Sequence, residues 1–171
     1  MSSLMRLIVS SIFFVGTIAS LSASVNAADV KQQLVGTWRV TSFSILTTET
    51  NETAHPYGEN PIGYIQYSPG GHVVVFMQAG DPPKPATLPY TDPERAKIHA
   101  GMFGAYAGTY NVEGNKVTHH IVASWRPDWI GGDQVRYFEL DGNTLTIKTA
   151  PLISNLTGKQ SVATLTFERV E

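Results

Sequence analysis

Two adjacent histidines within an apolar segment are the residues whose types most readily suggest chemistry. His119 and His120 occupy neighbouring positions of a strand predicted over 116–124. Neighbouring side chains of a strand point to opposite faces, so the pair cannot ligate one metal ion without distortion. We expect one surface histidine and one interior histidine, which is a hydrogen-bonded core residue, a general acid/base or a polar anchor for a ligand head group. The alternation does not say which histidine faces inward, so both are candidates for acid/base catalysis, and His120 is taken as the candidate ligand-binding residue.

Tyrosines recur on the other predicted strands. Tyr64, Tyr106 and Tyr110 would give an interior an apolar wall with hydroxyl tips. Tyr106 and Tyr110 share a face with Gly108, which lacks a side chain and is expected to leave space beside the two rings. These residues are the predicted wall of a ligand pocket.

One arginine and one tryptophan complete the set of candidate ligand-binding residues. Arg136 lies mid-strand among apolar residues. If it points inward it needs a partner, either Glu139, Glu168 or a ligand carboxylate, and if it points outward it is an ordinary surface cation. Trp129 belongs to a loop over 125–132 that either presents its indoles as a lid or docking patch, or folds back over the core.

Several classes of function are excluded by residues that the sequence lacks. The chain has no cysteine, so thiol catalysis and thiolate metal sites are ruled out. His72 and His99 stand alone, so we predict no metal site. No phosphate loop, nucleophile elbow or dinucleotide fingerprint occurs, so we predict no cofactor. The net charge of −2, without a basic patch, makes nucleic acid an unexpected partner.

The first 27 residues have the pattern of a secretory signal peptide. A short stretch with one positive charge precedes an apolar run over 7–21, and Val25 and Ala27 suit signal peptidase cleavage. The alternative is an uncleaved membrane anchor, but the apolar run is short for a bilayer span. We therefore predict an exported protein, periplasmic or secreted, with a single domain over 28–171 and no stable membrane insertion after cleavage.

The rest of the chain predicts an all-β domain. Short runs rich in β-branched and aromatic residues alternate with turns, and a short helix starts near Thr91 or Asp92 and ends about Phe103. The expected strands cover 37–45, 62–67, 72–77, 106–112, 116–124, 133–140, 144–149 and 161–170. Eight strands with mostly short connections favour an antiparallel up-and-down barrel, which leaves no open edge. A two-sheet sandwich is the alternative, and an outer-membrane barrel is disfavoured because the strands are short.

The sequence also resembles the bacterial and fungal lipocalin-like domain family, a divergent group of calycin-type barrels. The G-x-W pattern of lipocalins is present as Gly36-Thr37-Trp38, and Arg169 resembles the lipocalin arginine that packs across this tryptophan. Phe167 stands where the family more often has tryptophan. Further matching stretches are 34–40, 55–58, 63–68, 106–110, 117–120, 127–131, 134–138, 145–149 and 166–170. The resemblance implies a barrel closed at one end by a structural Trp38–Arg169 pair.

Three functions are compatible with such a barrel. The favoured one is the binding of a small hydrophobic or amphipathic ligand in the interior. The second is an isomerase or cyclase that uses an interior histidine or tyrosine as acid/base on a hydrophobic substrate, and the third is a structural barrel with a filled interior. The orientation of the candidate residues discriminates among them. The ligand's identity and the oligomeric state are left open by the sequence.

Overall fold

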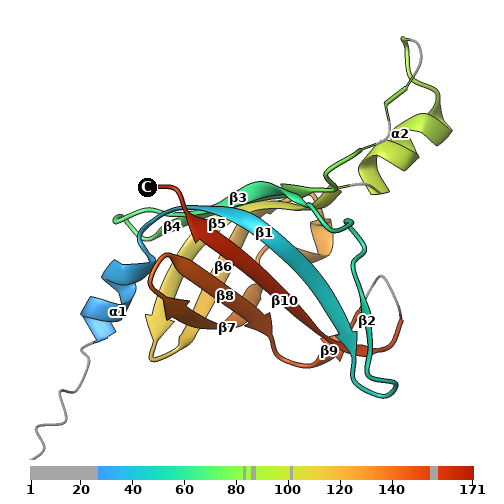
Figure 1. Ribbon diagram of the computed structural model, residues 1–171. Coiled ribbons are helices and arrows are strands. Elements are labelled where there is room, and N and C mark those ends of the chain that lie inside the picture. Colours follow the sequence, from blue (N-terminus) through green and yellow to red (C-terminus); the bar gives the residue numbers. More distant parts are fainter. Residues whose placement is uncertain (1–26, 83, 86–87, 101, 155–157) are drawn as a thin grey trace, which may run out of the picture.

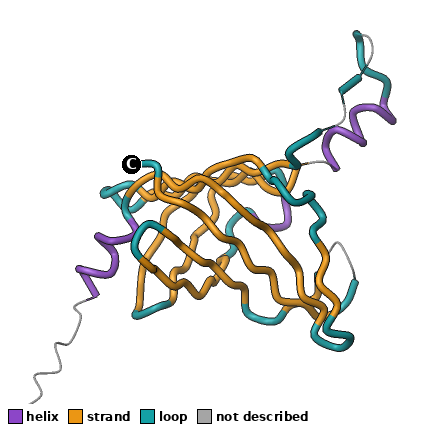
Figure 2. Tube along the Cα trace, in the orientation of Figure 1, coloured by secondary structure: helices purple, strands orange, loops and turns teal. Residues whose placement is uncertain are grey.

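The fold is a closed antiparallel barrel, seen in a computed structural model that describes residues 27–171 except 83, 86–87, 101 and 155–157 (Figures 1 and 2). Eight strands close the barrel in the order β1-β3-β4-β5-β6-β7-β8-β10, and β10 pairs back with β1. They are β1 (Gly36–Thr47), β3 (Ile62–Tyr67), β4 (His72–Gln78), β5 (Met102–Glu113), β6 (Lys116–Ser124), β7 (Asp133–Asp141), β8 (Thr144–Thr149) and β10 (Gln160–Arg169). The predicted eight-stranded barrel is confirmed.

The structure differs from the sequence prediction in two additional short strands and in a strand, β5, that begins earlier than expected. β2 (Glu52–Ala54) pairs with the end of β1, and β9 (Leu152–Ile153) pairs with the start of β10. The helix α2 (Asp92–Ala100) ends before Phe103, and β5 begins at Met102, because Met102 pairs with Gln78 of β4. Pairing with β4 thus extends the strand into a segment whose local sequence favours helix.

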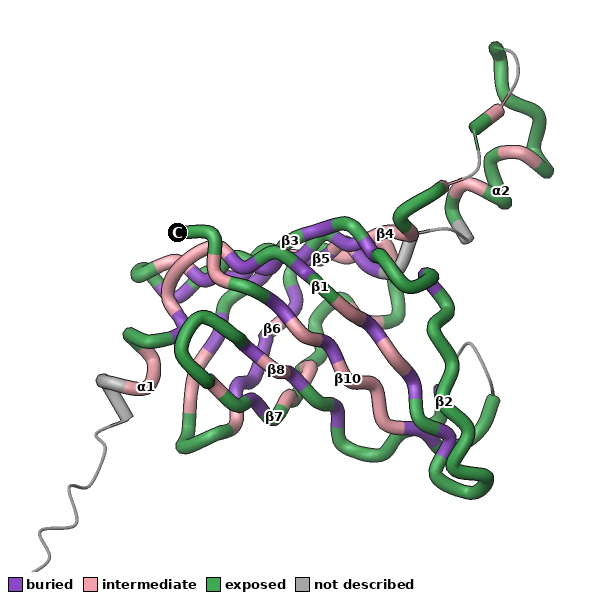
Figure 3. The backbone as a smooth tube through the Cα atoms, in the orientation of Figure 1, coloured by how far each residue is buried: buried purple, intermediate pink, exposed green. Residues whose placement is uncertain are grey.

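The core lies inside the barrel, and burial alternates along most of the strands, most regularly in β3 and β4. In β3, Ile65 and Tyr67 are buried while Ile62 and Tyr64 are exposed, and β4 shows the same pattern. Figure 3 shows the buried and exposed positions alternating along the barrel strands. Because side chains of a strand alternate between its two faces, the period-2 pattern fixes which residues reach the interior.

One end of the barrel is closed by the helix α1 (Ala27–Leu34) and the Trp38–Arg169 pair. The Trp38 indole is fully buried, and its Nε1 donates to the backbone oxygen of Leu34 at 2.9 Å. The Arg169 guanidinium lies 3.9 Å from the centre of the indole ring and donates to the backbone oxygens of Val35 and Gln33 at 2.8 and 2.5 Å. The expected cation–π contact is present, and the same arginine ties the last strand to the helix that covers this end.

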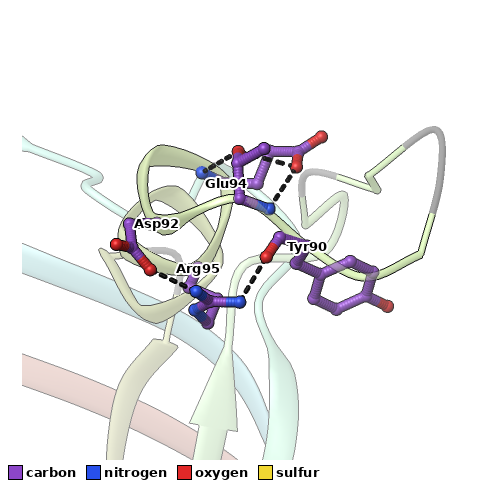
Figure 4. A network of polar contacts seen from close by, with 5 residues as sticks. Tyr90, Asp92, Glu94 and Arg95 are labelled. Carbon is purple, nitrogen blue, oxygen red and sulfur yellow. Dashed lines mark hydrogen bonds and ion pairs between the residues drawn. The ribbon is translucent and has the colours of Figure 1, made fainter.

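The segment with α2 projects from the other end of the barrel (Figure 1). Thr91 caps the helix as expected: its backbone N–H donates to the Glu94 carboxylate at 2.8 Å, and the Glu94 N–H returns to the Thr91 hydroxyl (Figure 4). Arg95 adds contacts to Asp92 and to the backbone oxygen of Tyr90. No helix among the described residues has the length and apolar composition to cross a bilayer. The predicted signal peptide lies outside the described residues apart from its last residue.

Gly108 does not leave space beside the tyrosine rings, so that expectation is wrong. A bulge falls between Ala107 and Gly108 where β5 pairs with β6. A Cβ atom placed on Gly108 would lie 1.9 Å from the backbone oxygen of His120. The glycine therefore allows two backbones to approach closely at the bulge, which is a known use of glycine within strands.

The substitution Gly108→Ala is expected to lower the free energy of unfolding by about 1–3 kcal/mol, because the new methyl group forces β5 and β6 apart. Gly104→Ala in the same strand is the matched control, since its Cβ would meet only Trp125 Nε1 at an ordinary 3.5 Å. Urea denaturation followed by circular dichroism measures both. Equal stability of the two variants would contradict this account of the bulge.

Candidate functional site

His119 is the interior histidine, and it links two tyrosines. It shares the inward parity of Val117 and Ile121 and is 1% exposed. Its Nε2 lies 2.9 Å from the Tyr67 hydroxyl of β3, and its Nδ1 lies 2.9 Å from the Tyr106 hydroxyl of β5. Three strands therefore bring together a continuous Tyr67–His119–Tyr106 chain of hydrogen bonds, which we call the interior relay.

His120 lies on the outer face, so the expectation that it lines the ligand pocket is wrong. Its Nδ1 is 2.6 Å from the Asp133 carboxylate, and its Nε2 is 2.6 Å from the Asn111 side-chain oxygen. Both partners lie on strands that pair with β6, so these polar contacts hold the ring against the outside of the barrel wall.

Burial keeps the interior relay uncharged. Desolvation, reinforced by the positive charge of Arg136 and by His120, lowers the pKa of His119 to about 3. Desolvation likewise raises the pKa of Tyr67 well above its ordinary value and raises the pKa of Tyr106. Near neutral pH all three groups are therefore neutral hydrogen-bonding groups.

Two adjoining cavities lie on the interior side of these residues. The inner one, about 40 Å³, is lined by Tyr106 and His119 together with aliphatic side chains of several strands. The outer one, about 290 Å³, has a mixed lining. Its apolar part includes Phe43, Ile45 and Leu152, and its polar part is formed by Arg126, Gln134, Arg136, Thr149, Ser154 and Ser161. Both cavities share the residues Trp129, Arg136, Thr149 and Ala163. The shared residues place Trp129 and Arg136 at the junction between the two spaces.

Arg136 faces this junction and has no carboxylate partner among the described residues. Its guanidinium donates to the backbone oxygen of Val135 at 2.8 Å and to the Gln134 side-chain oxygen at 3.1 Å, both neutral acceptors. Of the two expected glutamate partners, Glu168 is instead paired with Arg39 at 2.6 Å, and Glu139 is exposed. Neither glutamate is therefore the partner, and of the three alternatives considered for an inward Arg136 a ligand carboxylate is the one left.

Trp129 folds back onto the barrel and forms part of the wall of both cavities. It ends a 3₁₀ turn, η1 (Pro127–Trp129), and its ring meets Tyr106 edge to face at 5.7 Å between centroids. The Arg126 guanidinium covers the indole at 4.8 Å and is itself paired with Asp128 at 2.5 Å. The loop thus folds over the core, the second of the two arrangements considered for it.

The remaining predicted tyrosines lie away from both cavities. Tyr64 is 47% exposed on the outer face of β3, so its predicted place on the pocket wall is wrong. Tyr110 is buried and packs edge-on against Tyr67, and its hydroxyl donates to the backbone oxygen of Ser68 at 3.0 Å. It lines neither cavity. Sequence reasoning did not select Tyr67 as a site residue, although its parity with Ile65 marks it as an interior one.

Comparison with known proteins agrees with the geometry. The model of the lipocalin-like domain family matches residues 35–170, which is nearly the whole of the described chain. A comparison with curated proteins finds none that matches. A family match of this extent, on a closed eight-stranded barrel, shows that the chain belongs to the lipocalin-like domain family.

Proposed function

We propose that this protein is an exported carrier whose barrel binds a small hydrophobic or amphipathic ligand in the outer cavity. The observation that carries the proposal is the outer cavity itself, about 290 Å³ of space in which an apolar wall faces polar side chains. Of the two arginines that line it, Arg126 is paired with Asp128, whereas Arg136 has no carboxylate partner in the described chain. Small-molecule sites likewise combine an apolar wall with polar groups that fix the ligand's orientation. The apolar run of residues 7–21 supports the proposal of export.

The sizes of the cavities limit the ligand. The outer cavity is at the lower end of the range of about 300–1,000 Å³ that is usual for small-molecule sites. The inner cavity of about 40 Å³ has room for little more than a water molecule. The ligand is therefore small, and most of it lies in the outer cavity with one end directed toward the interior relay. A completely filled structural barrel would lack the outer cavity.

Filling the outer cavity is expected to weaken binding. Ala163→Phe would place a ring between the two cavities, whereas Val162→Phe, at the neighbouring position of opposite parity, adds the same ring on the other face of β10. Calorimetric titration with octan-1-ol and with octanoate is expected to show at least about tenfold weaker binding of both to Ala163→Phe and little change with Val162→Phe. Failure of both compounds to bind the unaltered protein would refute the carrier proposal.

An acid–base isomerase or cyclase is the second candidate function, favoured by the relay that reaches the cavity through Tyr106. General acid–base catalysis is most efficient when the pKa of the group lies near the working pH. The pKa of His119 is far below neutrality and that of Tyr106 is raised, so neither group exchanges a proton readily near pH 7. The same contacts suit the orientation of a ligand, and we therefore place binding first.

A further inference from the structure

We infer that the ligand carries a carboxylate, held at the junction of the two cavities by the Tyr106 hydroxyl and the Arg136 guanidinium. The inference rests on the proposed carrier function and specifies the chemical class of the ligand's head group. It follows from the direction in which the protons of the interior relay must point, which the burial of Tyr67 determines.

Tyr67 must donate its hydroxyl proton to His119. The side chain is 1% exposed, and its only hydrogen-bond partner within the described residues is Nε2 of His119. A buried hydroxyl proton that points at no acceptor loses its hydrogen bond to water without compensation, which is costly in a protein interior. The Tyr67 O–H therefore donates to Nε2, and Nε2 carries no proton.

The next two steps follow from the chemistry of neutral imidazole. With Nε2 as the acceptor, the ring proton is on Nδ1, because the ring is neutral and one nitrogen must be the donor. Nδ1–H then donates to the Tyr106 oxygen at 2.9 Å. The Tyr106 hydroxyl proton is not used in that bond, and because Tyr106 lines the inner cavity, this proton is left to donate into the cavity.

Arg136 supplies more donors and the positive charge at the same place. Two of its N–H groups are engaged by neutral acceptors, and the rest of the guanidinium has no acceptor among the described residues. Arg136 and Tyr106 line the inner cavity together, and the charge of Arg136 acts on both Tyr106 and His119. Thr149 lines the same place, and its hydroxyl oxygen already accepts from the Ala163 N–H at 3.0 Å. The polar end of the site thus consists mainly of donors and one cation.

A site of donors and a cation selects an anionic acceptor. A carboxylate offers acceptor oxygens in the geometry that the guanidinium fork matches, and its charge offsets that of Arg136. A primary ammonium group, which has donors only, would leave all of these protons without acceptors and would be repelled. An alcohol satisfies one donor and leaves the charge unpaired. The apolar side of the outer cavity, which includes Phe43, Ile45 and Leu152, then holds the tail of the same molecule.

The test compares three probes with the same eight-carbon tail: octanoate, octan-1-ol and octylamine. Isothermal titration of the unaltered protein is expected to show octanoate binding about ten- to a hundredfold more tightly than octan-1-ol, with octylamine weakest, as for hydrogen bonds to a charged group. Equal affinities for octanoate and octan-1-ol would overturn the inference while leaving the carrier function standing. Absence of binding by octanoate and octan-1-ol alike would overturn the carrier function itself.

Variants locate the selectivity in the two residues. Tyr106→Phe keeps the ring and removes the donor, and it is expected to weaken octanoate about tenfold while changing octan-1-ol much less. Arg136→Gln is expected to abolish the preference for octanoate. Tyr110→Phe is the control, since its hydroxyl is bound to Ser68 and it lines neither cavity. Unchanged selectivity in Tyr106→Phe and Arg136→Gln would overturn the assignment.

The proton direction has its own readout, which does not depend on ligand or on the folding of a variant. The ¹⁵N shifts of an imidazole distinguish a protonated from an unprotonated ring nitrogen. We expect His119 to show a protonated Nδ1 and an unprotonated Nε2 in the unaltered protein near pH 7. A proton on Nε2 would reverse the relay and overturn the claim that Tyr106 donates into the cavity.

Discussion

Replacing Trp38 with alanine is expected to lower the free energy of unfolding by about 3–5 kcal/mol, a large fraction of a small domain's stability. The indole is fully buried, donates to Leu34 in α1 and lies under the Arg169 guanidinium. Its removal leaves a cavity at the closed end of the barrel. It also leaves the Leu34 carbonyl without its hydrogen-bond donor and the Arg169 guanidinium without the ring that it covers. Chemical denaturation followed by far-ultraviolet circular dichroism measures the change.

Trp129→Ala is the matched control for this prediction. Trp129 is the same residue type, but it is only half-buried and lies beside the cavities, where space is already present. We expect Trp129→Ala to destabilise the protein less than Trp38→Ala does. We also expect Trp129→Ala to weaken the binding of octanoate and octan-1-ol, whereas the folded molecules of Trp38→Ala should bind both probes as the unaltered protein does. If the two variants lost similar stability, the closed end would not have the structural role given to it here.

Acidification is expected to reduce stability steeply, with His119 as a principal cause. The pKa of His119 is about 3 in the folded protein and near its ordinary 6.5 in the unfolded chain. Between these values the unfolded chain binds the additional proton, so the contribution is fully present above about pH 6.5 and is lost as the pH falls toward 3. One such group changes the unfolding free energy by up to about 1.4 kcal/mol per pH unit in that window.

The groups around His119 reinforce rather than cancel this effect. Arg136 of β7 repels a charged imidazole, as does His120 on the same strand, and the facing Tyr67 and Tyr106 are neutral hydroxyls whose pKa values are raised. His119→Gln retains a donor and an acceptor but does not titrate. Its unfolding free energy should therefore fall less steeply between pH 6.5 and 3 than that of the unaltered protein. Parallel pH profiles for the two proteins would contradict the assignment.

Most strands of the barrel could be predicted from the sequence, because the patterns that identify a strand lie within a few neighbouring residues. Alternation and turn residues placed β3, β6 and β8 at their observed bounds. The pairing of β1 with β10, which closes the barrel, joins Trp38 to Arg169 across nearly the whole chain. No local pattern contains that contact, and the resemblance to lipocalins supplied the expectation of it.

The site was less predictable because it depends on which face of each strand is inside. Neither the face with Val117, His119 and Ile121 nor the face with Thr118, His120 and Val122 is purely polar, so alternation was not used to choose between the two histidines. Tertiary contacts made the choice: His119 meets tyrosines of β3 and β5. The role of Gly108 could not be predicted either. The backbones of β5 and β6 approach closely there because of a bulge, and a bulge leaves no mark in the alternation of the sequence.

The most direct test of the account is the location of a bound carboxylate. Amide shifts of the ¹⁵N-labelled protein, followed by nuclear magnetic resonance during titration with octanoate, report the binding site residue by residue. The account predicts saturable changes at Trp129, Arg136, Thr149 and Ala163, which both cavities share, and none at Trp38 and Arg169 at the closed end. Changes confined to the closed end or the outer face, or no saturable change at all, would contradict it.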